Sequence, residues 1–153
     1  MDSLISPDTG GSAFSQTSDF LAHVTLALGL AASDGHRLVS PQAVDAGDGM
    51  QYRLNMRERE NYASGRPEVL LPILVDDLAG EEVSRLLSAQ AMILVESGWY
   101  LGMSQEGLLQ LSALGWLDDP ETVVQSIEQA SEIGRQVMRM FAGFESSSIF
   151  TSH

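Results

Sequence analysis

One segment, residues 81–97, constrains the fold of this chain more than any other. Its pattern predicts a helix whose apolar side chains cover well over half of the circumference: Val83, Leu86, Leu87, Ala89, Ala91, Met92, Ile93, Leu94 and Val95. A surface helix needs an apolar stripe only ~100° wide. A chain of 153 residues has little material with which to cover both sides of this helix. We therefore expect a second copy of the chain to cover it, and burial in the chain's own core is the alternative.

The charge of the chain limits the partners that it can bind. Its 21 acidic and 8 basic residues give a formal net charge of −13. Such a surface repels phosphate backbones and anionic lipid, so we expect neither nucleic acid nor membrane as a partner. The lack of cysteine excludes disulfides and thiolate chemistry. The sequence has no signal-peptide pattern and no run of ~18 apolar residues, which favours a cytoplasmic protein.

The domain organisation follows from where periodic patterns begin and end. We expect one domain at residues 18–144, with flexible tails at 1–17 and 145–153. Within it, residues 19–32 predict a first helix that ends at Asp34-Gly35. Its apolar stripe (Phe20, Leu21, Val24 and Leu28) is accounted for mostly by core packing.

Residues 50–59 form the clearest strand pattern, because apolar and polar side chains alternate through them. The apolar side consists of Met50, Tyr52, Leu54 and Met56. One buried and one solvated face are typical of an antiparallel sheet with helices on one side.

The other elements are predicted from shorter signals. Residues 36–46 are a weak strand interrupted by Pro41, and Gly47-Asp48-Gly49 is a hairpin turn. Residues 61–67 are a loop before an apolar strand, 68–77, in which Pro72 requires a free edge or a bulge. Two strands, 99–105 and 108–114, precede a last helix that begins at Asp118-Asp119-Pro120 and ends near Phe141.

Chemistry-bearing motifs are scarce. The three histidines, His23, His36 and His153, form no metal-binding pattern, and the HExxH, GxSxG and P-loop motifs are missing. Asp45 and Asp48 resemble part of a calcium loop, but the other ligand positions are missing, so a hairpin explains them better. The pairs Asp76-Asp77 and Asp118-Asp119 fit a strand end and a helix cap. We therefore expect no enzyme, cofactor or metal site, and keep a small-molecule-binding protein or enzyme as the remote alternative.

The order helix, three strands, helix, two strands, helix resembles the class I type III secretion chaperones, the Tir chaperone family. The segments that carry the resemblance are LGLAASDG (28–35), MQYRLNMRER (50–59), EVLLPILVDD (68–77), GWYLGMSQEGLLQL (98–111) and VVQSIEQASEIGRQVMRMF (123–141). The resemblance implies an α+β homodimer of order α-β-β-β-α-β-β-α, in which helices pack on a twisted antiparallel sheet. It also implies a bacterial cytoplasmic protein without enzymatic activity.

The resemblance further implies a function: binding the N-terminal segment of secreted effectors, which stay soluble and export-competent. Carried over by position, the effector-binding residues are Phe20, Leu21, Val24, Leu28, Tyr52, Leu54 and Met56. The dimer interface is Leu87, Met92, Val95, Trp99 and Leu101, for each of which simple core packing is the alternative. The export ATPase is a further candidate partner. A regulator that sequesters a transcription or secretion factor, and a general chaperone with many effectors, remain open alternatives.

Overall fold

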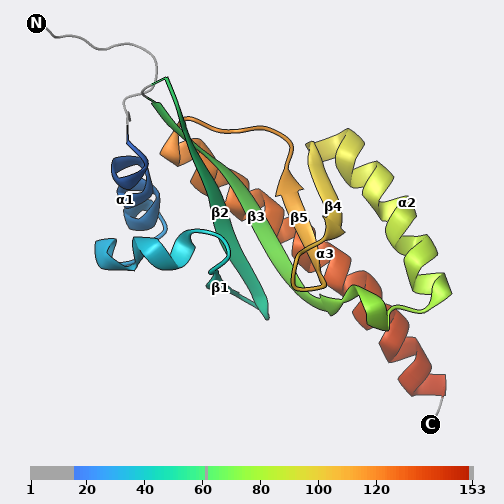
Figure 1. Ribbon diagram of the computed structural model, residues 1–153. Coiled ribbons are helices and arrows are strands. Elements are labelled where there is room, and N and C mark those ends of the chain that lie inside the picture. Colours follow the sequence, from blue (N-terminus) through green and yellow to red (C-terminus); the bar gives the residue numbers. More distant parts are fainter. Residues whose placement is uncertain (1–15, 61, 152–153) are drawn as a thin grey trace, which may run out of the picture.

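A five-stranded antiparallel sheet forms the centre of the computed structural model, which describes residues 16–60 and 62–151 (Figure 1). Its strands are β1 (Val44–Gly47), β2 (Met50–Arg59), β3 (Tyr62–Leu74), β4 (Trp99–Met103) and β5 (Leu108–Ala113). They lie in the order β1-β2-β3-β5-β4, and every neighbouring pair is antiparallel. The expectation of an α+β fold with helices packed on an antiparallel sheet is confirmed.

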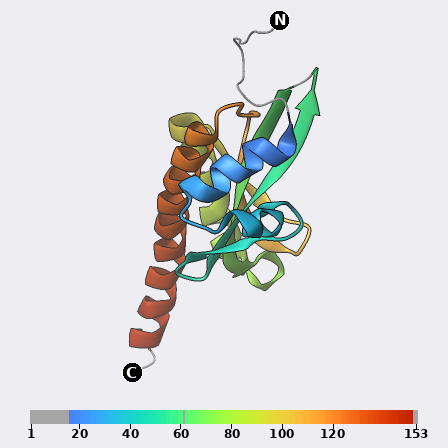
Figure 2. The same cartoon turned by 90° about the vertical axis from the view of Figure 1, so that its left-hand side faces the viewer.

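Three α-helices surround the sheet: α1 (Thr17–Ala27), α2 (Gly80–Ser97) and α3 (Pro120–Thr151). The long α3 covers one face of the sheet, while α1 and α2 lie at its two opposite ends (Figure 1). The view in Figure 2 shows α1 crossing toward α3. Two short 3₁₀ helices, η2 (Ala32–Leu38) and η3 (Val75–Asp77), complete the structure. No helix in the described part of the chain has the length and apolar character needed to cross a bilayer.

The core lies between the sheet and α3. Alternation along β2 turns Met50, Tyr52 and Leu54 inward, where each is buried. Gly134 lets α3 approach the sheet closely, because a Cβ there would lie 2.8 Å from Leu71 Cδ2. The other large buried side chains come from all five strands, α1 and α3, and include Phe20, Val24, Val69, Leu109, Leu111, Val123 and Ile127.

The opposite face of the sheet is polar, as the alternation of β2 predicts. It is not fully solvated, which differs from the expectation. Arg53 is only 4% exposed and bonds Glu68 Oε1 at 3.0 Å and Glu106 Oε2 at 2.8 Å. On the same face the guanidinium of Arg57 lies 4.3 Å from the Trp116 ring centroid, and that of Arg66 lies 5.4 Å from it. Loops therefore cover part of this polar face, which was expected to be solvated.

Several expected boundaries are wrong for identifiable reasons. The first helix ends at Ala27, before Asp34, because Gly29 takes a left-handed φ of 82°. Residues 36–46, expected as a strand, instead end η2 and reach β1 only at Val44. Residues 62–67, expected as a loop, are the first half of β3.

The two prolines of β3 show how a strand accommodates a missing N–H. Gly65 N donates to Leu117 O on the side away from β2, and Pro67, two residues on, faces the same side. The pairing of β3 with β5 begins only at Glu68, so Pro67 interrupts no bond to β5. Pro72 lies in the register shift between Leu70 and Leu74, where the pairing with β5 is interrupted, which fits the expectation that it needs a free edge or a bulge.

The chain ends also differ from expectation. The helix α3 continues to Thr151, past its expected end near Phe141 and into the stretch 145–153, for which a flexible tail was expected. Gly143, which lies just past the expected end of this helix, is tolerated inside a helix at a cost of ~1 kcal/mol. Residues 152–153 and most of the expected N-terminal tail, residues 1–15, lie outside the described residues.

Candidate protein-binding site

The outer face of α2 is the most unusual surface of the described structure. All 18 residues of α2 are described, and none of them is buried. Val95 is 85% exposed, Leu87 is 61% exposed, and Val83 and Leu94 are 37% and 36% exposed. We call these four residues the outer α2 face. Isolated exposed apolar residues are ordinary, whereas a row of them along one helix indicates a binding surface.

The charges of α2 lie on a different side of the helix from this face. At 3.6 residues per turn, Val83, Leu87 and Leu94 share one side, and Ala91 and Val95 follow next to them. The same spacing puts the charged residues, Glu81, Glu82, Arg85 and Glu96, on the opposite half. The charged side is accessible as well, since Glu81, Arg85 and Glu96 are exposed and Glu82 is half-buried, so α2 exposes both an apolar side and a charged side. The outer α2 face is therefore an apolar side of the helix that the single chain leaves uncovered.

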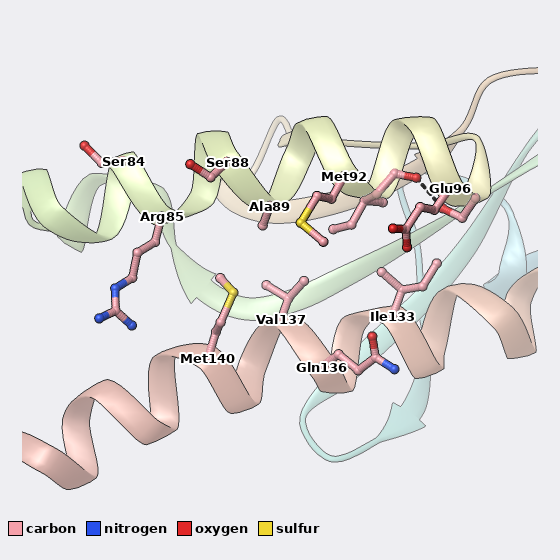
Figure 3. A pocket seen from close by; sticks show the side chains of 12 residues that line it. Ser84, Arg85, Ser88, Ala89, Met92, Glu96, Ile133, Gln136, Val137 and Met140 are labelled. Atoms are coloured by element: carbon pink, nitrogen blue, oxygen red, sulfur yellow. Dashed lines mark hydrogen bonds between the residues drawn. The ribbon is translucent and has the colours of Figure 1, made fainter.

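A groove of about 610 Å³ runs along the other side of α2, between α2 and α3, and the charged Arg85 and Glu96 are part of its lining (Figure 3). Its apolar walls are Ala89, Met92 and Ile93 from α2 with Ile133, Val137 and Met140 from α3. Met92 is 60% exposed and points toward α3. Methionine adapts easily to different neighbours, so this wall can accept apolar side chains of varied shape.

Only part of the expected dimer interface is on the surface. Leu87, Met92 and Val95 are exposed, which fits the expectation. Trp99 and Leu101 are only 3% and 2% exposed, because their side of β4 faces the core, so assigning them to an interface is wrong. The Trp99 indole N–H donates to Gln129 Oε1 of α3 at 3.1 Å. Val83 and Leu94 were missed, although their helical spacing from Leu87 signals them.

The expected effector-binding residues are mostly core. Phe20, Val24 and Leu54 have no exposed surface, and Tyr52 is 7% exposed, so these four cannot form an open binding patch. The stripe of α1 is covered by the sheet and α3 of the same chain. Leu21, Leu28 and Met56 are half-buried at the rim of the core, and for them the binding role stays a prediction.

The outer edge of β2 is a second feature that a partner can use. On this side β1 pairs only as far as Tyr52, and Ser40 N donates to Leu54 O. Beyond that point, the peptide groups of Met56 and Glu58 face outward without a backbone partner among residues 16–60 and 62–151. A free edge of this kind accepts an added strand.

The start of α1 stands beside this open edge. The N–H and hydroxyl of Thr17 donate to Glu58 Oε2 at 3.0 and 2.8 Å, and these bonds lower the pKa of Glu58. An added strand would therefore have α1 as its neighbour.

The two interaction features lie at opposite ends of the sheet (Figure 1). In the described part of the chain, His, Asp and Glu side chains form no cluster of three that could hold a metal ion. Comparison of the chain with protein-family models, with curated proteins and with solved structures found no match.

Proposed function

We propose that this protein is a homodimeric type III secretion chaperone that binds the N-terminal segment of one or more effectors and keeps them soluble and export-competent. The observation that carries the proposal is the outer α2 face, an apolar helix surface without cover in the single chain. Further support comes from the resemblance of the sequence to class I chaperones and from the α+β fold with its antiparallel sheet.

In the proposed dimer, two copies of α2 meet across a twofold axis. Such an interface uses the same patch on both copies, so each apolar residue of the patch contributes one buried side chain from each copy. Complete burial of one Val or Leu side chain is worth about 1.5–3 kcal/mol, which makes Leu87 and Val95 the main contributors.

The effector segment, in this proposal, binds at the other end of the sheet. An extended segment adds to the open edge of β2 near Met56 and Glu58, where main-chain hydrogen bonds give affinity without demanding one sequence. The helix α1, which begins beside this edge at Thr17, carries the half-buried Leu21 and the 60% exposed Leu26. The net charge of −13 favours neutral or basic segments.

The dimer is tested by light scattering on the wild type and on the Leu87→Glu/Val95→Glu variant. We expect a dimer for the wild type and a monomer for the variant, because four carboxylates would meet in the interface. Leu26→Glu, an equally exposed leucine at the other end of the sheet, is the matched control and should remain dimeric. A wild-type monomer at micromolar concentration would refute the dimer.

The client is tested by affinity capture from the native host, with mass spectrometry of the eluate. We expect two copies of this chain to hold one larger secreted protein through its N-terminal region. Several such clients would identify a general chaperone. A cytoplasmic protein that is never exported would instead assign the regulatory function.

A further inference from the structure

A second hollow lies between the C-terminal end of α1, strand β1 and the middle of α3, where Figure 2 shows these elements converging. Its volume is about 360 Å³. Its polar lining consists of Asp45, Tyr52, Glu128, Ser131 and Arg135, and Leu28 contributes an apolar wall. We call this hollow the α1–α3 pocket. It lies at the opposite end of the sheet from α2.

Two largely buried residues that carry hydroxyl groups, Tyr52 and Ser131, line the α1–α3 pocket. Tyr52 is 7% exposed and Ser131 is 8% exposed. Neither side chain makes a hydrogen bond to any residue that the structure describes. A polar group of a ligand in the pocket would give these hydroxyls a hydrogen-bond partner in place of solvent. These two hydroxyls therefore point to a polar ligand.

The charges around the pocket determine the sign of that ligand. The carboxylates of Asp45 and Glu128 line it, and within the described residues neither forms an ion pair. The one cation in the lining, Arg135, is already held by Glu132 Oε1 at 3.0 Å and by Asp48 Oδ2 at 3.9 Å. The pocket therefore keeps a negative charge.

The end of α1 adds to this negative potential. Leu28, the C-cap of α1, forms part of the wall, and the last turn of the helix contains no basic residue. The carboxyl end of a helix carries a partial negative charge that favours cations. Burial and the nearby Asp45 carboxylate raise the pKa of Tyr52, so its hydroxyl stays protonated at neutral pH.

We propose that the α1–α3 pocket binds a guanidinium or ammonium group, supplied by an arginine or lysine side chain of the bound effector segment. The carboxylates of Asp45 and Glu128 accept its N–H donors, and the Tyr52 and Ser131 oxygens accept the remaining ones. Leu28 and the other apolar wall residues contact the methylene stem. The assignment of the cation to an effector rests on the proposed function, whereas the cation site itself does not.

The site is tested by NMR titration of the ¹⁵N-labelled full chain with N-acetyl-arginine amide. N-acetyl-citrulline amide, which has the same shape without the charge, is the matched probe. We expect shift changes concentrated at the amides of Asp45, Tyr52, Glu128 and Ser131, with the citrulline probe binding about tenfold more weakly. Equal shifts with both probes, or none with either, would overturn the proposal.

A pair of double variants then separates the pocket from the general acidity of the chain. Asp45→Asn/Glu128→Gln should abolish binding of the arginine probe. Asp76→Asn/Glu121→Gln removes the same charge from exposed positions elsewhere and should leave binding unchanged. Equal binding by both double variants would show that the cation is held by the overall charge, and would refute the pocket.

The link to the effector is tested on a captured client. The Asp45→Asn/Glu128→Gln variant should bind the client's N-terminal segment more weakly, by about tenfold, than the exposed-site control does. Unchanged client binding would overturn the assignment of the cation to the effector. Failure to find any client would contradict the proposed function alone, because the titration with the arginine probe does not depend on it.

Discussion

Arg53 is a charged side chain that the fold keeps almost entirely from solvent. It donates to Glu68, Glu106 and Gln110 and also to the carbonyl oxygen of Pro41. These bonds connect β2 to β3, to the turn between β4 and β5, and to the segment before β1. The alternation of β2 predicts which side of the sheet Arg53 faces, but not that loops distant in the sequence bury it there.

Glu106 makes this network sensitive to acid. The hydrogen bond from Arg53 lowers the pKa of Glu106 from 4.5 to about 2. Since the folded pKa is the lower one, the contribution of Glu106 to stability is present above pH 4.5 and is lost as the pH falls toward 2. The side chain is 39% exposed, so solvent screening limits this contribution to about 1 kcal/mol.

Urea unfolding of the wild type and of Glu106→Gln between pH 6 and pH 2.5 measures this contribution. We expect the wild type to be the more stable at pH 6 and the difference to shrink through the acid range. The other carboxylates are common to both proteins and cancel in the comparison. A constant difference across the range would contradict the role of the Glu106 charge.

At the scale of single elements, local signals predicted the helix at 81–97 and the strand at 50–59 well. Both have strong periodicity, and each is bounded by a clear turn residue such as Gly98, which ends α2 with a φ of 76°. The boundaries that failed depend on tertiary contacts. Residues 62–67 extend β3 because β2 offers a partner along its whole length, which outweighs the turn propensity of their Gly and Pro.

The turn of the β1–β2 hairpin offers a test at the same scale. Gly49 has a φ of 82°, and a Cβ there would lie 3.1 Å from Pro72 Cγ in a rigid ring. We expect Gly49→Ala to destabilise the protein by about 1–2 kcal/mol, because an L side chain is strained in this conformation. Gly115→Ala is the control, since a Cβ there meets nothing within 4 Å. Equal unfolding midpoints for the two variants would refute this account of the turn.

At the scale of the whole molecule, the candidate surfaces were predicted only in part. The wide apolar surface of residues 81–97 indicated that one chain cannot bury all of this helix. In the structure no residue of α2 is buried, and Leu87, Met92 and Val95 are exposed. Periodicity alone cannot say which apolar stripe meets the chain's own core. For this reason Val24 and Leu54 were assigned to a binding patch although both are fully buried. Likewise, the α1–α3 pocket combines residues from four separate elements and leaves no local signal.

The proposed dimer predicts a stability that depends on concentration. If unfolding is coupled to dissociation, the Tm of the wild type should rise with protein concentration, by the equivalent of about 1.4 kcal/mol per tenfold. The Leu87→Glu/Val95→Glu variant should show no such dependence. Scanning calorimetry over a hundredfold range of concentration would distinguish the two, and a constant Tm for the wild type would count against the dimer.

The placement of α1 and α2 at opposite ends of one sheet has an evolutionary consequence (Figure 1). Substitutions at well-separated sites usually act additively, so a change near α1 leaves the energetics of the outer α2 face unaltered. Under the proposed function, duplicated copies of such a dimeric chaperone can acquire different clients while they still recognise each other as subunits. Mixed pairs with two different client specificities would then arise without any change at α2.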